Sequence, residues 1–397
     1  MHTARSTRSV TLPDQPRLAR YLQTPELGPR VLFFSGGTAL NSLSRKLVHY
    51  THNSIHLVTA FDSGGSSAKL REAFQMPAVG DLRSRLMALA DQTIKGNPEI
   101  LRLFTFRLPM DDDPAFLRQW LDRLCSGRDA LIRQIPEPMF GIIRNHLRLF
   151  QQHMPTDFDL RGASIGNLIL TAGYLSGERR MDQVIFLFSK LAGVRGIVRP
   201  ITNKYLHLAA KLEDGQWVVG QHLLTGKEVP VITSRVKRIC LSRDRMLVDP
   251  VAMTLDENIR RMILQAELIC YPMGSFYSSL IANLLPYGVG QAIAENDCPK
   301  VYIPNTGIDP EQCGMSLADN VRVLLHYLRK GCDAEQPVNR LLNFVLLDTH
   351  ADGYVQPMDL EKVRDLGVDV IQMPLAQGEQ NLRLNEDRLI KVLLSLI

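Results

Sequence analysis

The segment Val31-Leu-Phe-Phe-Ser-Gly-Gly-Thr-Ala-Leu-Asn41 decides the fold of this chain. Its first four residues form a wholly apolar run, which predicts a short strand buried on both faces. Ser35-Gly36-Gly37-Thr38 interrupts the run, and leucines follow at helical spacing at positions 40, 43 and 47. A strand, a glycine turn and a helix in this order place backbone N–H groups at a helix N-terminus, where the helix dipole favours an anion. A tight turn without a ligand is the alternative, because the segment matches neither G-x-G-x-x-G nor G-x-x-x-x-G-K-[ST].

A second unit of the same kind follows. Ile55-His-Leu-Val-Thr-Ala-Phe61 predicts another buried strand, which runs into the polar turn Asp62-Ser-Gly-Gly-Ser-Ser67 and then a helix from Ala68. Two consecutive strand–turn–helix units predict parallel strands joined by right-handed crossovers. Their glycine turns then lie at the same carboxyl edge of the sheet, where doubly wound folds bind their ligands.

The same alternation continues to the end of the chain. Gly80-Asp-Leu-Arg83 opens a helix that we expect to run to Asp91, with Asp81 as its N-cap. Arg83 opposes the helix dipole in the first turn, which makes more sense if an anion binds nearby. Four more apolar runs predict strands, at 268–271, 301–303, 344–347 and 368–373. The sequence therefore predicts an α/β fold, Rossmann-like and doubly wound, with a mainly parallel sheet.

Three segments depart from this pattern. Residues 1–28 carry several arginines and three prolines and predict a basic, flexible N-terminal tail, with a transit peptide as the less favoured reading. Residues 97–160 predict a helical insert, because leucine and phenylalanine recur there at helical spacing. Residues 204–224 change to a period of two around a turn at Glu213-Asp-Gly215, which predicts a β-hairpin at or beside the edge of the sheet. The main α/β domain then spans residues 29–397.

Composition excludes several classes of protein. The chain has 397 residues, of which 45% are hydrophobic and 22% charged, as in a globular protein. A net charge of +5 with only 7% aromatic residues does not favour nucleic-acid binding. The six cysteines are widely spaced and signal neither a zinc site nor a disulfide framework. No apolar run approaches the ~20 residues that span a bilayer. We expect a cytoplasmic protein that binds neither nucleic acid nor membrane; a homo-oligomer is compatible with the sequence.

Five motifs in register resemble the CofD-like family, which includes 2-phospho-L-lactate transferase and the YvcK-type gluconeogenesis factors. The motifs are S-G-G-T at 35–38, D-S-G-G-S-S at 62–67, G-D-L-R at 80–83, G-A-S-I-G-N-L at 162–168 and M-G-S-F-Y-S-S-L-I-A-N-L-L at 273–285. The chain is more similar to the YvcK-type branch. The resemblance implies a sheet that binds a nucleotide diphospho-conjugate or a nucleotide sugar. The transferase branch moves a phospholactyl group onto a deazaflavin hydroxyl with Mg²⁺, whereas the YvcK-type branch binds UDP-sugars and influences carbon metabolism and envelope growth.

The motifs and the turn chemistry together predict the site. Asp62 is predicted to meet the acceptor hydroxyl or Mg²⁺, with a simple Asx-turn as the alternative, and Asp81 to help hold the metal. Arg83 is predicted to neutralise phosphate charge, which suits a planar guanidinium. Asn167 is predicted to read the base, or else to be a core asparagine bonded to protein. The predicted phosphate- and nucleotide-binding residues are Gly36, Gly37, Thr38, Gly64, Gly65, Ser66, Ser67, Asn167, Gly274, Ser275 and Asn305.

The chain also departs from the family pattern. Ala39 stands where the family usually has glycine, Ser63 replaces a second carboxylate, and Ala163 replaces a usual histidine; the stretch after Asn305 also differs. These departures leave three functions open. A Mg²⁺-assisted CofD-like transferase is the first, and a non-catalytic nucleotide-sugar-binding regulator of the YvcK type is the second. An NAD(P) oxidoreductase is a distant third, because G-x-G-x-x-G is absent and fold alone does not fix function.

Overall fold

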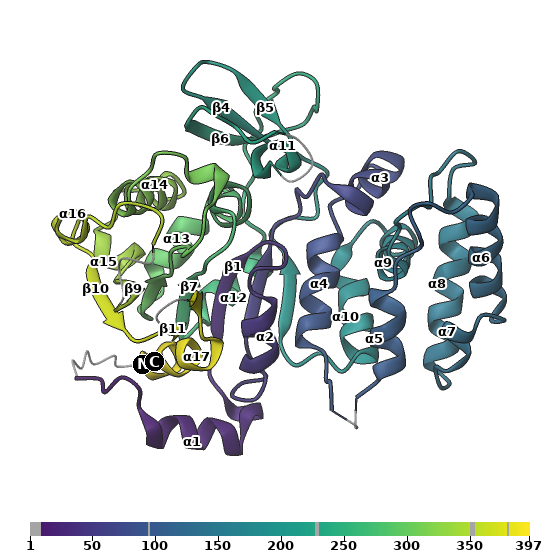
Figure 1. Cartoon of the computed structure of the whole chain (residues 1–397), viewed down its shortest axis with the longest axis horizontal. Coiled ribbons are helices and arrows are strands. Elements are labelled where there is room, and N and C mark those ends of the chain that lie inside the picture. Colours follow the sequence, from purple (N-terminus) through teal and green to yellow (C-terminus); the bar gives the residue numbers. More distant parts are fainter. Residues whose placement is uncertain (1–8, 94–95, 227–229, 350–353, 379–380) are drawn as a thin grey trace.

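A seven-stranded parallel sheet lies at the centre of the computed structural model, which describes residues 9–93, 96–226, 230–349, 354–378 and 381–397 (Figure 1). The strand order is β10-β9-β8-β7-β1-β2-β3, and every pair in it is parallel. The sheet grows in both directions from β1, as doubly wound folds do. The predicted fold class is therefore confirmed. The strands are β1 (Val31–Ser35), β2 (Ile55–Val58), β3 (Ile197–Pro200), β7 (Leu268–Tyr271), β8 (Lys300–Tyr302), β9 (Phe344–Asp348) and β10 (Asp369–Met373).

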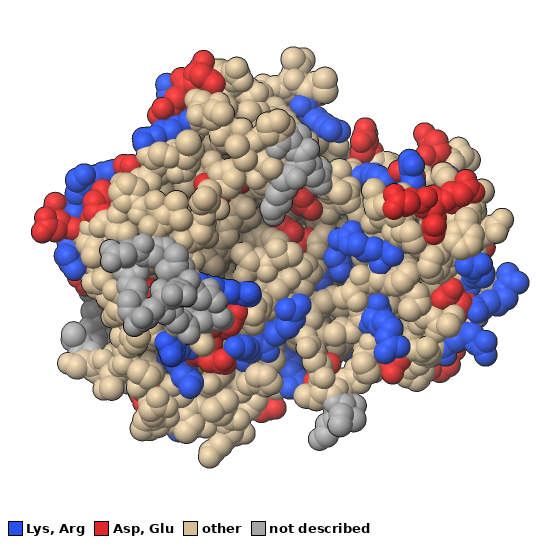
Figure 2. All heavy atoms as spheres, in the orientation of Figure 1, with Lys and Arg blue, Asp and Glu red and all other residues tan. Residues whose placement is uncertain are grey.

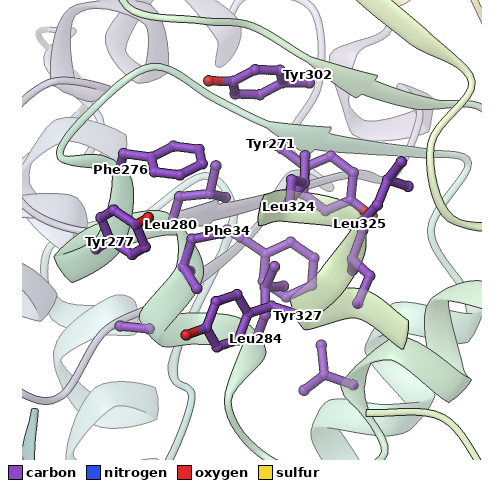
Figure 3. Packing of buried hydrophobic residues seen from close by; sticks show 14 of the residues in the cluster. Phe34, Tyr271, Phe276, Tyr277, Leu280, Leu284, Tyr302, Leu324, Leu325 and Tyr327 are labelled. Carbon is purple, nitrogen blue, oxygen red and sulfur yellow. The ribbon is translucent and has the colours of Figure 1, made fainter. Parts of the chain in front are cut away.

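Helices cover both faces of the sheet, which explains the wholly apolar strands. All five residues of β1 are buried. Phe33 packs in the core shared with α2 (Asn41–Leu47) and α17 (Glu386–Ser395). Phe34 points to the opposite face and stacks on Tyr271, with ring centroids 5.9 Å apart (Figure 3). The elements of that second face are α12 (Glu257–Leu264), the π-helix η2 (Phe276–Leu280), η3 (Ile281–Leu284), α13 (Val289–Glu295), η4 (Pro310–Gln312), α14 (Leu317–Lys330), α15 (Val338–Leu341) and α16 (Leu360–Asp365).

A largely helical region extends from the β2–β3 side of the sheet and has a core of its own (Figure 1). It contains α3 (Gly65–Phe74), α4 (Gly80–Leu89), α9 (Ile165–Ser176) and α10 (Met181–Leu191). The range predicted as a helical insert holds α5 (Pro98–Thr105), α6 (Pro114–Ser126), α7 (Ala130–Arg133) and α8 (Met139–His153). The acidic run before Pro114 is a helix start, because the Asp113 carboxylate accepts from Phe116 N–H at 3.3 Å.

The predicted hairpin forms, but it does not extend the parallel sheet. β4 (His207–Leu212) pairs with β5 (Trp217–Val219) and, along its other edge, with β6 (Val236–Ser242), so the three make a separate antiparallel sheet. This sheet and the short helix α11 (Gln221–Thr225) sit beyond the carboxyl end of β1, at the top of Figure 1. We call these four elements the cap. A further small pair is β11 (Ala376–Gly378) with β12 (Asn381–Leu384).

The N-terminal stretch differs from the predicted flexible tail. Residues 15–23 form α1 (Gln15–Gln23), followed by η1 (Pro25–Leu27). Asp14 caps α1 by accepting from Arg17 N–H at 3.1 Å, and its own N–H donates to Ser395 Oγ at 2.8 Å. Leu18 is only 2% exposed because it packs in the same core as α17. The prediction is therefore wrong for residues 15–27, while residues 1–8 lie outside the described chain. Within the described residues, no helix combines the length and apolar character needed to cross a bilayer.

Candidate functional site

The first glycine turn follows β1 and is closely packed. A Cβ on Gly36 would lie 2.2 Å from Ser279 Oγ, and a Cβ on Gly37 would lie 2.8 Å from Asp81 Oδ1. The turn therefore fits between η2 and α4 only without side chains. Among the described residues, no protein acceptor contacts the N–H groups of Gly36, Gly37 and Thr38. These groups can donate to a bound anion.

Arg85 fixes the orientation of this turn, and sequence reasoning missed it. Its side chain is fully buried, with Nη1 donating to Ser44 Oγ at 2.7 Å. Nη2 donates to the carbonyl oxygens of Gly37 at 3.0 Å and Gly36 at 3.3 Å. Because a trans peptide holds its C=O and N–H on opposite sides, these bonds turn the N–H groups of Gly37 and Thr38 away from Arg85. The only sequence signal was a second arginine two residues after Arg83.

The second turn follows β2 and brings a carboxylate beside the first. Asp62 Oδ1 accepts from Gly64 N–H at 3.1 Å, so the Asx-turn considered as an alternative is present. Its other oxygen, Oδ2, lies beside Gly80, where an added Cβ would be 3.2 Å away. The Ser66 hydroxyl accepts from Ser164 N–H at 3.4 Å, which ties the start of α3 to that of α9. The turn chemistry thus uses only one oxygen of Asp62.

Asp81 is not the helix cap that the sequence suggested. α4 already begins at Gly80, its N-cap position is Val79, and no side chain caps it. Asp81 therefore lies inside the first turn, where Thr59 Oγ1 donates to its Oδ2 at 3.4 Å. Gly80 is the first residue of α4, one residue before the expected cap, and it packs against α3, since an added Cβ would lie 2.3 Å from Ser67 Oγ. The Asp81 carboxylate consequently lies beside the glycine turn, with Oδ1 2.8 Å from the position of a Cβ on Gly37.

Arg83 and Asn167 form one buried unit. Arg83 is 9% exposed, and its Nε donates to Asn167 Oδ1 at 2.9 Å. Burial, and secondarily the charge of Arg107, lower the Arg83 pKa from 12.5 to about 10, so the side chain is charged at neutral pH. The Asn167 amide also donates to Ser66 Oγ at 3.4 Å. Both ends of that amide are bonded to protein, as in the structural alternative for Asn167, and it orients the guanidinium.

A third loop follows β7 and is held by Asn305. Gly274 has φ +143°, which favours glycine, and its N–H donates to Asn305 Oδ1 at 2.8 Å. Asn305 Nδ2 returns a bond to the Gly274 carbonyl at 2.7 Å. The amide of Asn305 thus supports the loop instead of pointing its donors at a ligand.

The helix after this loop has its first N–H groups occupied. Phe276 N–H donates to Asp309 Oδ2 at 2.8 Å, and Tyr277 and Ser278 N–H donate to Glu311 Oε2 at 2.7 and 2.8 Å. Burial, and secondarily the nearby Asp309 carboxylate, raise the pKa of Glu311. An anion is therefore excluded from the N-terminus of η2, in contrast to the turn after β1.

The cap closes the cleft from above with residues that sequence reasoning also missed. Gln221, His222 and Thr225 of α11 line the cavity, together with Arg107 from the helical region. His222 Nδ1 lies 2.7 Å from Ser63 Oγ, and His222 N–H donates to the same oxygen at 3.2 Å. Ser63, where the family pattern has a second carboxylate, therefore anchors the cap. Nothing local to positions 221–225 marks them as site residues, because their place depends on how the two sheets dock.

These loops enclose one cavity of about 320 Å³ at the carboxyl edge of β1, β2 and β7. Figure 2 shows this face hollowed below the cap. Asn305 alone of the predicted site residues lies outside it, in an adjoining cavity of about 310 Å³ that also includes Gly274 and Ser275. The predicted residues that line the first cavity are Gly36, Gly37, Thr38, Asp62, Gly64, Gly65, Ser66, Ser67, Asp81, Arg83, Asn167, Gly274 and Ser275. The structure brings them together, and their roles stay predictions.

The donor set in this cavity is compatible with Mg²⁺. Mg²⁺ keeps several waters and is usually bound through one or two carboxylates and substrate phosphates. Asp62 and Asp81 both line the cavity, with the hydroxyl of Thr59 on Asp81. Across the described chain there is no group of three or more His, Cys, Asp or Glu side chains suited to a metal. The residues therefore fit an ion shared with a phosphate better than an ion held by protein alone.

Comparison with known proteins agrees with this arrangement. The family model described as 2-phospho-L-lactate transferase CofD matches residues 31–376. The chain belongs to the CofD family. The CofD-family match covers every residue predicted for the site and ends at the first residue of β11, before β12 and α17.

The similar proteins support the expected branch of the CofD family. A gluconeogenesis factor of Bacillus subtilis is 30% identical over 349 residues, which are 87% of each chain. A putative gluconeogenesis factor of Nostoc is 27% identical and covers 92% of this chain and 68% of its own. The crystal structure of a UPF0052-family protein from Bacillus halodurans shares the fold, with a TM-score of 0.67 at 24% identity over 92% of this chain and 99% of that one. The predicted resemblance to the YvcK-type gluconeogenesis factors is confirmed.

Proposed function

We propose that this chain binds a nucleotide diphospho-conjugate in the cleft and transfers its phosphoryl-linked group to an acceptor hydroxyl. The observation that carries the proposal is that the turn N–H groups, which contact no acceptor among the described residues, converge on one cavity with the buried Arg83, while Arg85 fixes the turn from behind. Among the described residues, the hydrogen bonds of Arg83 and Arg85 all go to neutral oxygens, and Asp81 is the carboxylate that favours the charged form of both. Two buried cations near a single carboxylate are costly, and a bound polyphosphate offsets that cost.

Transfer at phosphorus needs alignment and charge neutralisation more than a protein nucleophile. The acceptor oxygen forms the new O–P bond, the bond to the bridging oxygen breaks, and a nucleoside monophosphate leaves. The turn N–H groups and Arg83 would hold the charge that builds up on the phosphoryl oxygens. Asp62 Oδ2 would either take the acceptor proton or bind the metal. Mg²⁺, held by Asp62 and Asp81, would neutralise additional phosphate charge.

A non-catalytic nucleotide-sugar-binding regulator is the second candidate. The Ser63–His222 contact favours it, because the position that would hold a second carboxylate is occupied with anchoring the cap. The relatives named gluconeogenesis factors also favour it. An NAD(P) oxidoreductase is supported only by the doubly wound strand order.

Ligand-induced stabilisation separates these functions. A ligand that binds only the native state stabilises it by about 2.7 kcal/mol at 100 times its Kd. Thermal unfolding with GDP, UDP-sugars and NAD, with and without Mg²⁺, therefore identifies the ligand class. Stabilisation by NAD alone would exclude both nucleotide-conjugate functions. A regulator returns its nucleotide sugar intact after long incubation, whereas a transferase releases a nucleotide once an acceptor hydroxyl is present.

A further inference from the structure

The short helix α11 holds one polar side chain at a fixed place above the glycine turns. Gly220, at φ +117°, starts the helix, and His222 is tied to Ser63 through both its backbone N–H and its ring. Gln221 lies between these two fixed residues and lines the cavity. Its position relative to the β2 loop is therefore set by backbone and side-chain bonds on either side.

The Gln221 side chain is buried without the bonds that burial requires. It is 7% exposed, and Oε1 has no hydrogen-bond partner among the described residues. Buried polar atoms are nearly always bonded, so an exception at a cavity calls for a ligand or a functional cause. The last torsion of glutamine is broad, so the amide can turn toward a bound molecule without rotamer strain.

The chemistry of the missing partner follows from the atom concerned. A carbonyl oxygen accepts hydrogen bonds and does not donate them. A diphosphate at neutral pH offers mainly acceptor oxygens, which match the N–H groups of the turns and Arg83 instead. The donor that would satisfy Oε1 of Gln221 therefore belongs to another part of the ligand. Asn167, the residue predicted to read the base, has its amide engaged by Arg83 and Ser66.

We propose that Gln221 is a specificity-determining residue that accepts a hydrogen bond from an N–H or O–H donor on the nucleoside part of the ligand. The inference rests on the proposed function, since it takes a nucleoside diphosphate group as the occupant of the cavity. The inference assigns the diphosphate and the nucleoside of the ligand to different elements of the protein. The turns after β1 and β2 hold the phosphates, and the cap selects what is attached to them.

The variant Gln221→Leu tests the inference, because it removes the unbonded polar atom and nearly conserves volume. Removing a buried unsatisfied group is neutral or stabilising, so the melting temperature without ligand should stay the same or rise. Calorimetric Kd values for GDP or UDP should rise tenfold or more, while the Kd for inorganic pyrophosphate should change less than twofold. A merely structural role for Gln221 would lower the melting temperature and weaken all ligands alike. Gln221→Met provides the same test if the leucine variant folds poorly.

A matched control lies outside the cleft. Thr171 on α9 is fully buried, and its hydroxyl also has no partner among the described residues. Thr171→Val should keep or raise the melting temperature and leave every Kd unchanged. Comparison of ADP with GDP and UDP narrows the donor: adenine lacks the ring N–H of guanine and uracil but keeps an exocyclic NH2. A loss confined to GDP and UDP therefore indicates that ring N–H, and an equal loss with ADP indicates either the ribose hydroxyls or an exocyclic amine.

Two results would overturn the inference. One is a nucleotide Kd that Gln221→Leu leaves unchanged. The other is a pyrophosphate Kd that rises as much as the nucleotide Kd, which would place the side chain on the phosphates. If the unaltered protein binds neither nucleotides nor pyrophosphate, the proposed function fails and the inference fails with it.

Discussion

Replacing Arg85 by methionine should weaken phosphate binding as well as the fold, and the two losses have separate origins. The charged side chain is held in a fully buried position, where its pKa falls from 12.5 to about 10, mainly by desolvation. That fall in pKa means that the site disfavours the charged side chain, relative to the neutral one, by roughly 3 kcal/mol. Its three bonds, to Ser44, Gly36 and Gly37, return about 1.5 kcal/mol each at the lower end of the range for charged donors. The net loss for Arg85→Met is therefore about 1–2 kcal/mol of unfolding free energy.

The effect on binding has a different origin. Without Arg85 the two turn carbonyls lose their donors, so the N–H groups of Gly37 and Thr38 are no longer held toward the cavity. We expect the Kd for pyrophosphate to rise at least tenfold, which is about 1.4 kcal/mol. Arg85→Lys keeps the charge, but a single ammonium cannot hold all three acceptors in the same fork geometry. The Arg85→Lys protein should therefore bind pyrophosphate with a Kd at least five times that of the unaltered protein.

Urea unfolding and titration calorimetry with pyrophosphate measure the two effects separately. Lys300→Met is the matched control, because Lys300 is a buried cation (1% exposed) bonded to the Asn296 carbonyl. It is the first residue of β8 and so lies at the amino end of the strands, away from the cleft at their carboxyl ends. Lys300→Met should lower stability without changing the Kd. An Arg85→Met protein that unfolds more easily yet binds pyrophosphate with the original Kd would refute the positioning role of Arg85.

Three further changes test other parts of the site. Asp62→Asn should abolish most of the extra stabilisation that Mg²⁺ gives with GDP, measured by thermal unfolding; if both the Mg²⁺ effect and the ligand affinity stay intact, the metal and acceptor roles of Asp62 are wrong. Glu311 has a raised pKa in the folded state, so its contribution to stability is full below its ordinary value of 4.5 and is lost as the pH rises toward 7. Urea unfolding should consequently show that the unfolding free energy falls less from pH 5 to pH 8 for Glu311→Gln than for the unaltered protein. Equal falls in the two proteins would contradict the raised pKa of Glu311. Asn305→Ala removes two bonds to Gly274, each worth about 1 kcal/mol, and should lower the unfolding free energy by about 2 kcal/mol and weaken GDP binding; unchanged values for both would show that the loop after β7 holds its shape unaided.

Local sequence was sufficient for the parts of the fold that depend on local chemistry. A strand buried on both faces must be apolar throughout, so Val31–Ser35 could be placed from its residues alone. The glycine turns could also be predicted from their residues, because a close-packed turn needs glycine. In the structure, Gly36 and Gly37 do meet neighbours that leave no room for a side chain. Parallel pairing then required all these turns to lie at one edge, which brought the predicted residues together.

Most of the features that the sequence did not predict depend on a contact with a residue far away along the chain. α1 is ordered by Leu18 and Asp14 against the C-terminal helix, and no periodicity within residues 1–28 reveals that partner. Gln221 and His222 reach the cavity only because the antiparallel sheet docks over the β2 loop. Arg85 looks like any helical arginine until the carbonyls that it binds are known. Asp81 failed for a local reason instead, since α4 already starts at Gly80, whereas a cap at Asp81 predicts a first helical residue at Leu82.

The acidic pair Asp309 and Glu311 makes the β1 end and the β7 end of the cleft differ in the hydrogen-bond donors that they offer a ligand. On the β1 side the cleft presents Arg83 and the N–H groups of the glycine turn beside the carboxylates of Asp62 and Asp81, while on the β7 side Asp309 and Glu311 occupy the donors of η2. A molecule with one anionic and one neutral end would therefore be drawn in along a single direction, its phosphates toward β1 and β2. In the reverse orientation its phosphates would meet N–H groups that Asp309 and Glu311 already occupy, so the pair that caps η2 also disfavours that orientation.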